Sequence, residues 1–102
     1  LTKAIAYIDE NYMKQLDLNS ISESAGVSSQ HLCRLFRQTL NCRPMEYITK
    51  RKIQAAKILL TETQLTIEQI AEETGFCDSS YFCKIFKRNE CITPYIHNLY
   101  LL

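Results

Sequence analysis

Two segments of the chain, 18–25 and 67–74, carry apolar or small residues at every third or fourth position. This spacing places such side chains along one face of an α-helix. Each segment is followed by a glycine, Gly26 or Gly75, which can adopt the left-handed backbone conformation that ends a helix. The pattern therefore predicts two short helices, whose inward positions are Leu18, Ile21, Ser22 and Ala25, then Ile67, Ile70, Ala71 and Thr74.

Polar residues suited to helix capping stand before these segments and before a second helix that follows each of them. Asp17 and Thr66 precede the first helices, and Thr66 has the capping-box spacing with Gln69. Ser28 and Asp78 precede the second helices. A short helix, a glycine-containing turn and a second helix form a helix-turn-helix. The second helices direct Leu32, Leu35 and Phe36, or Phe82, Ile85 and Phe86, inward.

The two units are copies of one motif. Residues 17–26 align with 66–75 at an offset of 49, and residues 32–44 align with 82–94 at an offset of 50. The second copy therefore has one extra residue in its turn. Each copy is too short to bury a core alone, so we expect both to pack through the segment between them.

Three more helices complete an all-α fold of about seven helices. Two Gly and two Pro in 102 residues argue against sandwiches and barrels, which need many turns. We expect a helix over 3–12 capped by Thr2, a connector helix of about 25 Å from Pro44 to 61, and a short helix over 94–101. The predicted organisation is a first helix-turn-helix subdomain (1–43), the connector (44–61) and a second subdomain (62–102).

The net charge of +1 hides an uneven distribution, since ten of the twelve cations lie in two blocks, 28–57 and 79–88. Segregated cations can form a basic patch inside a neutral sum. The blocks contain Arg34, Arg37, Arg43, Lys50, Arg51, Lys52 and Lys57, then Lys84, Lys87 and Arg88.

Catalytic and metal chemistry are not indicated. The five cysteines include no C-x-x-C pair, and the only histidines are His31 and His97, so we expect reduced thiols, no metal, no cofactor and no enzymatic activity. No apolar run reaches the roughly 18 residues of a membrane span, and no signal peptide is visible, so we expect a cytoplasmic protein without membrane contact. Because the chain starts at Leu1 rather than Met, we expect it to be part of a longer protein that also has an N-terminal sensing or dimerisation domain.

The outward face of each second helix has the chemistry for reading DNA, because an α-helix fits the major groove. Arg can bond guanine and Gln can bond adenine, so the first unit should discriminate DNA sequences more sharply than the second. The second unit should bind mainly through phosphate contacts. His31 is expected to be a partly buried packing residue or a phosphate contact, and Tyr81 is expected to pack first and to contact the groove second. The predicted DNA-facing residues are Ser29, Gln30, His31, Cys33, Arg34 and Arg37, then Ser79, Ser80, Tyr81, Cys83, Lys84, Lys87 and Arg88.

The sequence resembles the AraC/XylS family of bacterial transcription regulators over nearly its whole length. Residues 70–76, 80–87 and Thr93-Pro94 resemble the family signature, residues 26–28 and 32–36 its first helix-turn-helix, and residues 47–48 and 51–53 its connector helix. Asn41 and Cys91 depart from it, standing where the family usually has Gly. The resemblance implies a seven-helix DNA-binding domain in which bases face Gln30, Cys33 and Arg34, then Ser79, Ser80, Cys83 and Lys84.

The tandem order of the units predicts an asymmetric DNA site with two adjacent major-groove segments, about 34 Å apart on straight DNA. Recognition helices held closer than that would require bent DNA. The alternative is a helical interaction module that uses the apolar tail 95–102 and the first helix to bind RNA polymerase or a sensor domain. An activator would need both functions.

Overall fold

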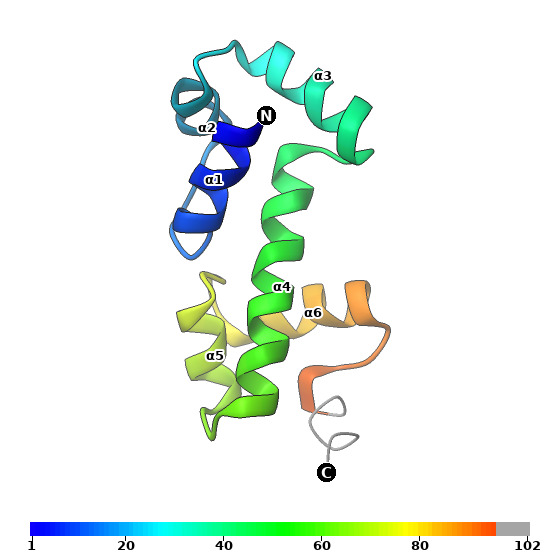
Figure 1. Ribbon diagram of the computed structural model, residues 1–102. Coiled ribbons are helices and arrows are strands. Elements are labelled where there is room, and N and C mark those ends of the chain that lie inside the picture. The colour runs from blue at the N-terminus through cyan, green and yellow to red at the C-terminus, as the bar shows by residue number, and fades with distance from the viewer. Residues whose placement is uncertain (96–102) are drawn as a thin grey trace. The chain divides into compact units, whose positions relative to one another are not determined.

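The computed structural model describes residues 1–95, and this part of the chain contains six α-helices and no strand, which confirms the all-α prediction (Figure 1). Of the helix expected over 94–101, Pro94 and Tyr95 are helical and the rest lies outside the described residues. The helices are α1 (Thr2–Asn11), α2 (Leu18–Ala25), α3 (Ser29–Leu40), α4 (Pro44–Glu62), α5 (Ile67–Glu73) and α6 (Ser79–Glu90).

The four caps predicted for the helix-turn-helix units are present. In each, a side-chain oxygen accepts a hydrogen bond from the backbone N–H three residues later, which satisfies a donor that the first turn of a helix leaves free. In α5 the capping box is complete, because the Gln69 side chain also accepts from the Thr66 N–H at 2.9 Å. The cap pairs are Asp17 with Ser20, Ser28 with His31, Thr66 with Gln69 and Asp78 with Tyr81.

The predicted cap of the first helix is wrong. Thr2 is itself the first residue of α1, Leu1 occupies the capping position, and no side chain caps this end. The physical reason is that the Leu1 carbonyl already accepts the first helical bond, from the Ile5 N–H at 3.0 Å. The helix therefore begins one residue earlier than the pattern indicated.

The chain divides into two compact units, residues 1–51 and the part from Lys52 onward. Both units take core residues from α4, which gives Ile48 to the first and Ile53, Ala56 and Leu60 to the second. The other buried residues of the first core are Ala4, Ile8, Ile21, Leu32, Phe36 and Cys42, and those of the second are Ile67, Ile70, Ala71, Phe76, Phe82, Ile85 and Phe86.

The two turns share one backbone design. Gly26 and Gly75 have φ angles of 70° and 86°, as the prediction of left-handed helix ends requires. The next residue then bonds back across the turn, from the Val27 N–H to the Ser22 oxygen at 3.1 Å and from the Phe76 N–H to the Ala71 oxygen at 2.9 Å. Val27 and Phe76 are thus equivalent, and the extra residue of the second copy is Cys77.

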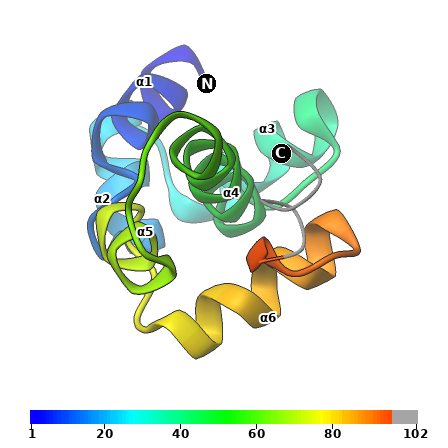
Figure 2. The same cartoon turned by 90° about the horizontal axis from the view of Figure 1, so that it is seen from below.

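Each unit is fastened to its own stretch of α4 by a cation. In the first unit, Arg51 Nε donates to Asp9 Oδ1 at 2.8 Å and the guanidinium lies 5.0 Å from the centre of the Tyr12 ring. In the second, Lys52 Nζ donates to the Gly75 carbonyl at 2.9 Å and lies 5.6 Å from the centre of the Phe76 ring. Within this unit, α6 runs across the direction of α5 (Figure 2), as the second helix of a helix-turn-helix does.

Candidate nucleic-acid interface

The second helices of the two units, α3 and α6, repeat one pattern of exposure at an offset of 50. One side is in the core: Leu32 and Phe36 in α3 and Phe82 and Phe86 in α6 are fully buried. The opposite side is exposed, and between them lie two half-buried positions that the helices share; Leu35 is also half-buried, whereas its equivalent Ile85 is buried. The exposed pairs are Gln30 with Ser80, His31 with Tyr81, Arg34 with Lys84, Arg37 with Lys87 and Gln38 with Arg88, and the half-buried pairs are Ser29 with Ser79 and Cys33 with Cys83.

The exposed cations of these helices have no ion-pair or hydrogen-bond partner among the described residues. Across residues 1–95, no ion pair or side-chain hydrogen bond involves Arg34, Arg37, Lys84, Lys87 or Arg88. An unpaired cation on a convex helix face is available for a phosphate or a base edge.

Most cations of the connector region behave differently from those of α3 and α6, although Lys50 is exposed like them. Arg43 lies 3.9 Å from Glu46, and Lys57 Nζ lies 2.8 Å from Glu90 Oε1. Arg51 and Lys52 fasten the two units to α4, as described above. Four cations of the basic block over 28–57 are therefore engaged with other groups of the fold, which charge counting alone did not reveal.

Ser29 is turned toward its own unit. Its hydroxyl donates to Asn19 Oδ1 at 3.3 Å and lies 3.3 Å from the Ser22 hydroxyl, which donates to the Asn19 carbonyl at 2.9 Å. These contacts join the start of α2 to the start of α3. The geometry gives Ser29 a positioning role for the helix whose next residue, Gln30, is exposed.

Cys33 and Cys83 lie half-buried between the exposed and the buried sides of their helices. Burial, with a smaller contribution from the negative charge of Glu68, raises the pKa of the Cys83 thiol. A raised pKa keeps this thiol neutral at physiological pH. The cysteines are all free, and residues 1–95 contain no cluster of three or more side chains that could hold a metal ion.

His31 and Tyr81 occupy equivalent positions but differ in their contacts. His31 is exposed, so the packing alternative is wrong for it, and a phosphate contact stays a prediction. Tyr81 is 48% exposed, and its ring lies 6.2 Å from that of Phe76, so it both packs and presents a surface.

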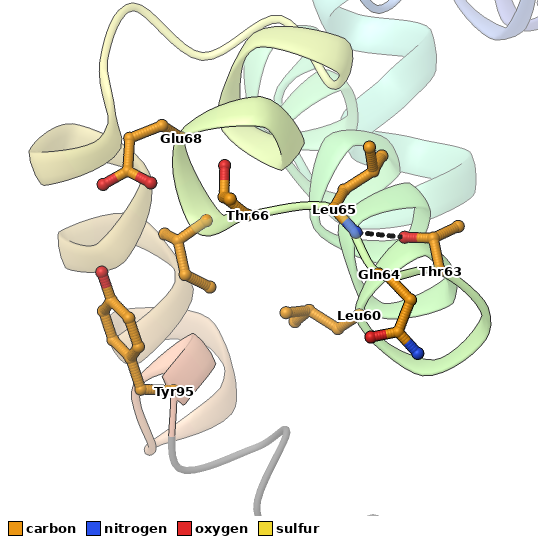
Figure 3. Close-up of a pocket in the computed structure, with 8 residues that line it drawn as sticks. Leu60, Thr63, Gln64, Leu65, Thr66, Glu68 and Tyr95 are labelled. Carbon is orange, nitrogen blue, oxygen red and sulfur yellow. Dashed lines mark hydrogen bonds between the residues drawn. The ribbon is translucent and has the colours of Figure 1, made fainter.

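A cavity of about 510 Å³ lies in the second unit, between the end of α4, the start of α5 and Tyr95 (Figure 3). Leu60 and Ile67 give it apolar walls, while Glu68 and Tyr95 bring a carboxylate and a hydroxyl to it. No pattern in the sequence indicates this cavity, and none of the residues predicted to face DNA lines it.

Three exposed residues beside the predicted surface were missed: Gln38, Asn19 and Glu68. Gln38 was missed although the repeat aligns it with Arg88, which was predicted. Asn19 and Glu68 lie in the first helices and were passed over because only the second helices were searched. The alignment of the two repeats indicates this position, because it pairs the amide of Asn19 with the carboxylate of Glu68 where both are exposed.

No helix in residues 1–95 combines the length and the apolar character needed to cross a lipid bilayer.

The chain is similar to known transcription regulators. The family model of a helix-turn-helix domain matches residues 21–95. The HTH-type transcriptional regulator YpdC of Escherichia coli is 32% identical over 88 residues, which are 86% of this chain and 31% of YpdC. The chain spans about a third of the length of the curated relatives it matches.

Two solved structures share both fold and sequence with this chain. The C-terminal domain of the two-component response regulator yesN from Fusobacterium nucleatum is 32% identical, with a TM-score of 0.86 and 93% of both chains covered. A Chromobacterium violaceum transcriptional regulator of the AraC-type DNA-binding domain-containing proteins is 30% identical, with a TM-score of 0.92 over 97% of this chain and 88% of that one. The chain therefore belongs to the AraC family of helix-turn-helix transcription regulators, as one of the domains with which that family binds DNA sequence-specifically.

Proposed function

We propose that each unit lays its second helix, α3 or α6, in a major groove of double-stranded DNA, and that the chain reads an asymmetric site made of two adjacent groove segments. The observation that carries this proposal is the position-by-position match of the exposed faces of α3 and α6. If the two copies only had to fold, they would need to share only the residues on the buried sides of α3 and α6. Here the repeat also keeps a row of exposed polar and cationic residues that have no partner in the described chain.

The residues divide into two roles under this proposal. Arg34 and Gln30 lie four positions apart on one face of α3, so they contact neighbouring base edges. Lys84 and Lys87 on α6 act mainly on phosphates, because a lysine is a point charge without the fork geometry that fits guanine, and Arg88 lies beyond them toward the end of the helix. The predicted set also includes Arg37, Ser80, Tyr81 and the half-buried Cys33, Ser79 and Cys83.

A binding titration tests the proposal. Fluorescence anisotropy with a labelled random-sequence duplex at low salt should show binding at micromolar protein, and the logarithm of the affinity should fall linearly with the logarithm of the salt concentration. Lys87→Ala should weaken binding to all sequences and reduce the salt slope by about one. If micromolar protein leaves the anisotropy of the duplex unchanged, the DNA proposal fails and the protein-interaction alternative is favoured.

Contact with RNA polymerase or with a sensing domain stays a prediction. It was assigned to the first helix, which is α1, and to the apolar tail 95–102, of which only Tyr95 lies within the described residues. Selection of binding sites from a random DNA pool would identify the operator that such a regulator controls.

A further inference from the structure

Asn19 in the first unit and Glu68 in the second are equivalent residues with opposite chemistry. Each is the second residue of its helix, α2 or α5, and each side chain is exposed. A carboxamide can donate hydrogen bonds to an anion, whereas a carboxylate only accepts them and repels an anion. The two units therefore differ in charge at positions 19 and 68, although both positions have the same place in their helices.

The side chain of Asn19 is oriented by α3. Its Oδ1 accepts the proton of the Ser29 hydroxyl at 3.3 Å, so its amide nitrogen points elsewhere. Within residues 1–95 that nitrogen has no hydrogen-bond partner, and it stands beside the end of α3 that presents Gln30. Asp17 in the same turn is anionic, but its Oδ1 is engaged by the N–H and hydroxyl of Ser20 at 2.8 and 2.9 Å.

The side chain of Glu68 stands in the corresponding place beside α6. Its charge acts on Cys83, a residue of α6, and Figure 3 shows its carboxylate extending from α5 away from α4. The carboxylate takes part in no ion pair in the described chain. Within the described residues the negative charge of Glu68 therefore has no ion-pair partner, and it acts on α6, the helix that also carries Lys84, Lys87 and Arg88.

We propose that this pair of positions sets how tightly each unit holds the DNA backbone, with Asn19 donating to a phosphate oxygen and Glu68 repelling one. The inference rests on the proposed function. In a helix-turn-helix bound to DNA the first helix crosses the sugar–phosphate backbone, which brings its exposed residues near phosphates. The first unit then binds the DNA backbone more tightly than the second. In the second unit, Glu68 lowers the affinity for phosphates that the cations of α6 would otherwise give.

A reciprocal exchange tests the proposal. On a random-sequence duplex at low salt, Glu68→Asn should tighten binding about three- to tenfold, because it removes a repulsion between like charges. Asn19→Glu should weaken binding about tenfold or more, since it replaces a hydrogen bond to a charged group with such a repulsion. Both effects should shrink as salt is raised, because added ions screen exposed charges.

Three controls make the exchange decisive. Glu73→Asn removes the same charge from α5 about 140° around the helix from Glu68, and it should change affinity far less. Asn19→Ala should weaken binding less than Asn19→Glu, because it removes the donor without adding a charge. Thermal unfolding followed by circular dichroism should show each variant folded; a carboxylate at position 19 suits the positive end of the helix dipole.

The outcomes separate this inference from the proposed function. If the unaltered chain binds duplex but Glu68→Asn has no effect, or no more than Glu73→Asn, the role of this position is overturned while DNA binding stands. If the unaltered chain binds no duplex at low salt, the proposed function fails and this inference fails with it. Opposite shifts for the two exchanges, with Glu73→Asn near neutral, support the proposal.

Discussion

The two helix-turn-helix units present the same face but support it by different means. In the first unit, hydrogen bonds among Asn19, Ser22 and Ser29 join α2 to the start of α3. In the second unit, rings pack around the turn, with Phe76 5.0 Å from Phe82. The inserted Cys77 lies between this aromatic contact and the α6 cap, so the turn was lengthened without altering the exposed pattern beyond it.

The difference shows which features of the motif are constrained. The exposed face of α3 or α6 depends on how the helix is oriented. Either polar contacts or apolar contacts with the preceding helix and turn can set that orientation. A polar contact depends on direction and distance, whereas aromatic packing gains from buried area and tolerates small shifts. The support can therefore change between copies while the face is kept, and the comparison can be tested unit by unit.

The largest expected effect is on the separate cores. Phe36→Ala should reduce the free energy of unfolding by about 3–5 kcal/mol, because it leaves a cavity in the first core. That is a large share of the stability of a domain this small. Native-state amide exchange should show protection lost mainly in α2 and α3, and the matched change Phe86→Ala should mainly expose α5 and α6. Equal loss of protection in all helices for either variant would contradict separate cores.

The next effect concerns how each unit reads DNA. Arg34→Ala should cost about 1–3 kcal/mol of binding free energy, concentrated at one or two base positions, because arginine can bond guanine bidentately. Lys84→Ala should cost less and should act evenly across the site, as loss of a phosphate contact does. Anisotropy titrations on a selected site and its single-base variants measure both. The division of roles is wrong if the two variants show the same profile of base discrimination.

Much of the fold was predictable because it depends on local signals. The helical periodicity, the glycine turns and the caps at Asp17, Ser28, Thr66 and Asp78 all act within a few residues, and the repeat supplied each signal twice. The start of α1 was missed because Thr2 looks like a cap, although a helix can begin without one.

The part that could not be predicted depends on contacts between distant residues. Periodicity placed Ser29 on the outer side of α3, but only the packing of α2 against α3 shows that its hydroxyl faces Asn19. In the same way, composition could not show that Arg51 and Lys52 are used to fasten α4, since their partners lie 42 and 23 residues away in sequence.

A smaller effect is expected where the second helices end. Asn41 and Cys91 close α3 and α6 with φ angles of 54° and 67°, the left-handed conformation that favours glycine. This is the position at which the sequence departs from the family pattern. Asn tolerates the conformation better than other non-glycine residues. Cys91→Gly should therefore stabilise the chain by about 0.5–1 kcal/mol, which is the relief of backbone strain less the added freedom of the unfolded chain.

Urea unfolding would measure the effect at these helix ends, with Cys91→Ala as the control that removes the thiol but keeps the Cβ. Asn41→Gly should gain less than Cys91→Gly. A loss of stability in Cys91→Gly, or an equal gain in Cys91→Ala, would show that backbone strain is not what Cys91 contributes to the end of α6.

The smallest effect distinguishes the caps of the two first helices. The hydrogen bonds from Ser20, chiefly from its backbone N–H, hold the pKa of Asp17 below its usual value, whereas Thr66 at the equivalent position does not titrate. A carboxylate whose pKa is lower in the folded than in the unfolded state stabilises the fold above the unfolded value. That contribution is lost as the pH falls through the folded value. As the pH is lowered through the acidic range, the amide protection factors, which correct for the intrinsic pH dependence of exchange, should therefore fall more in α2 than in α5. Asp17→Asn keeps a capping oxygen but removes the titration, so it should abolish the difference; a difference that persists in this variant would assign the acid sensitivity of the first unit to another group.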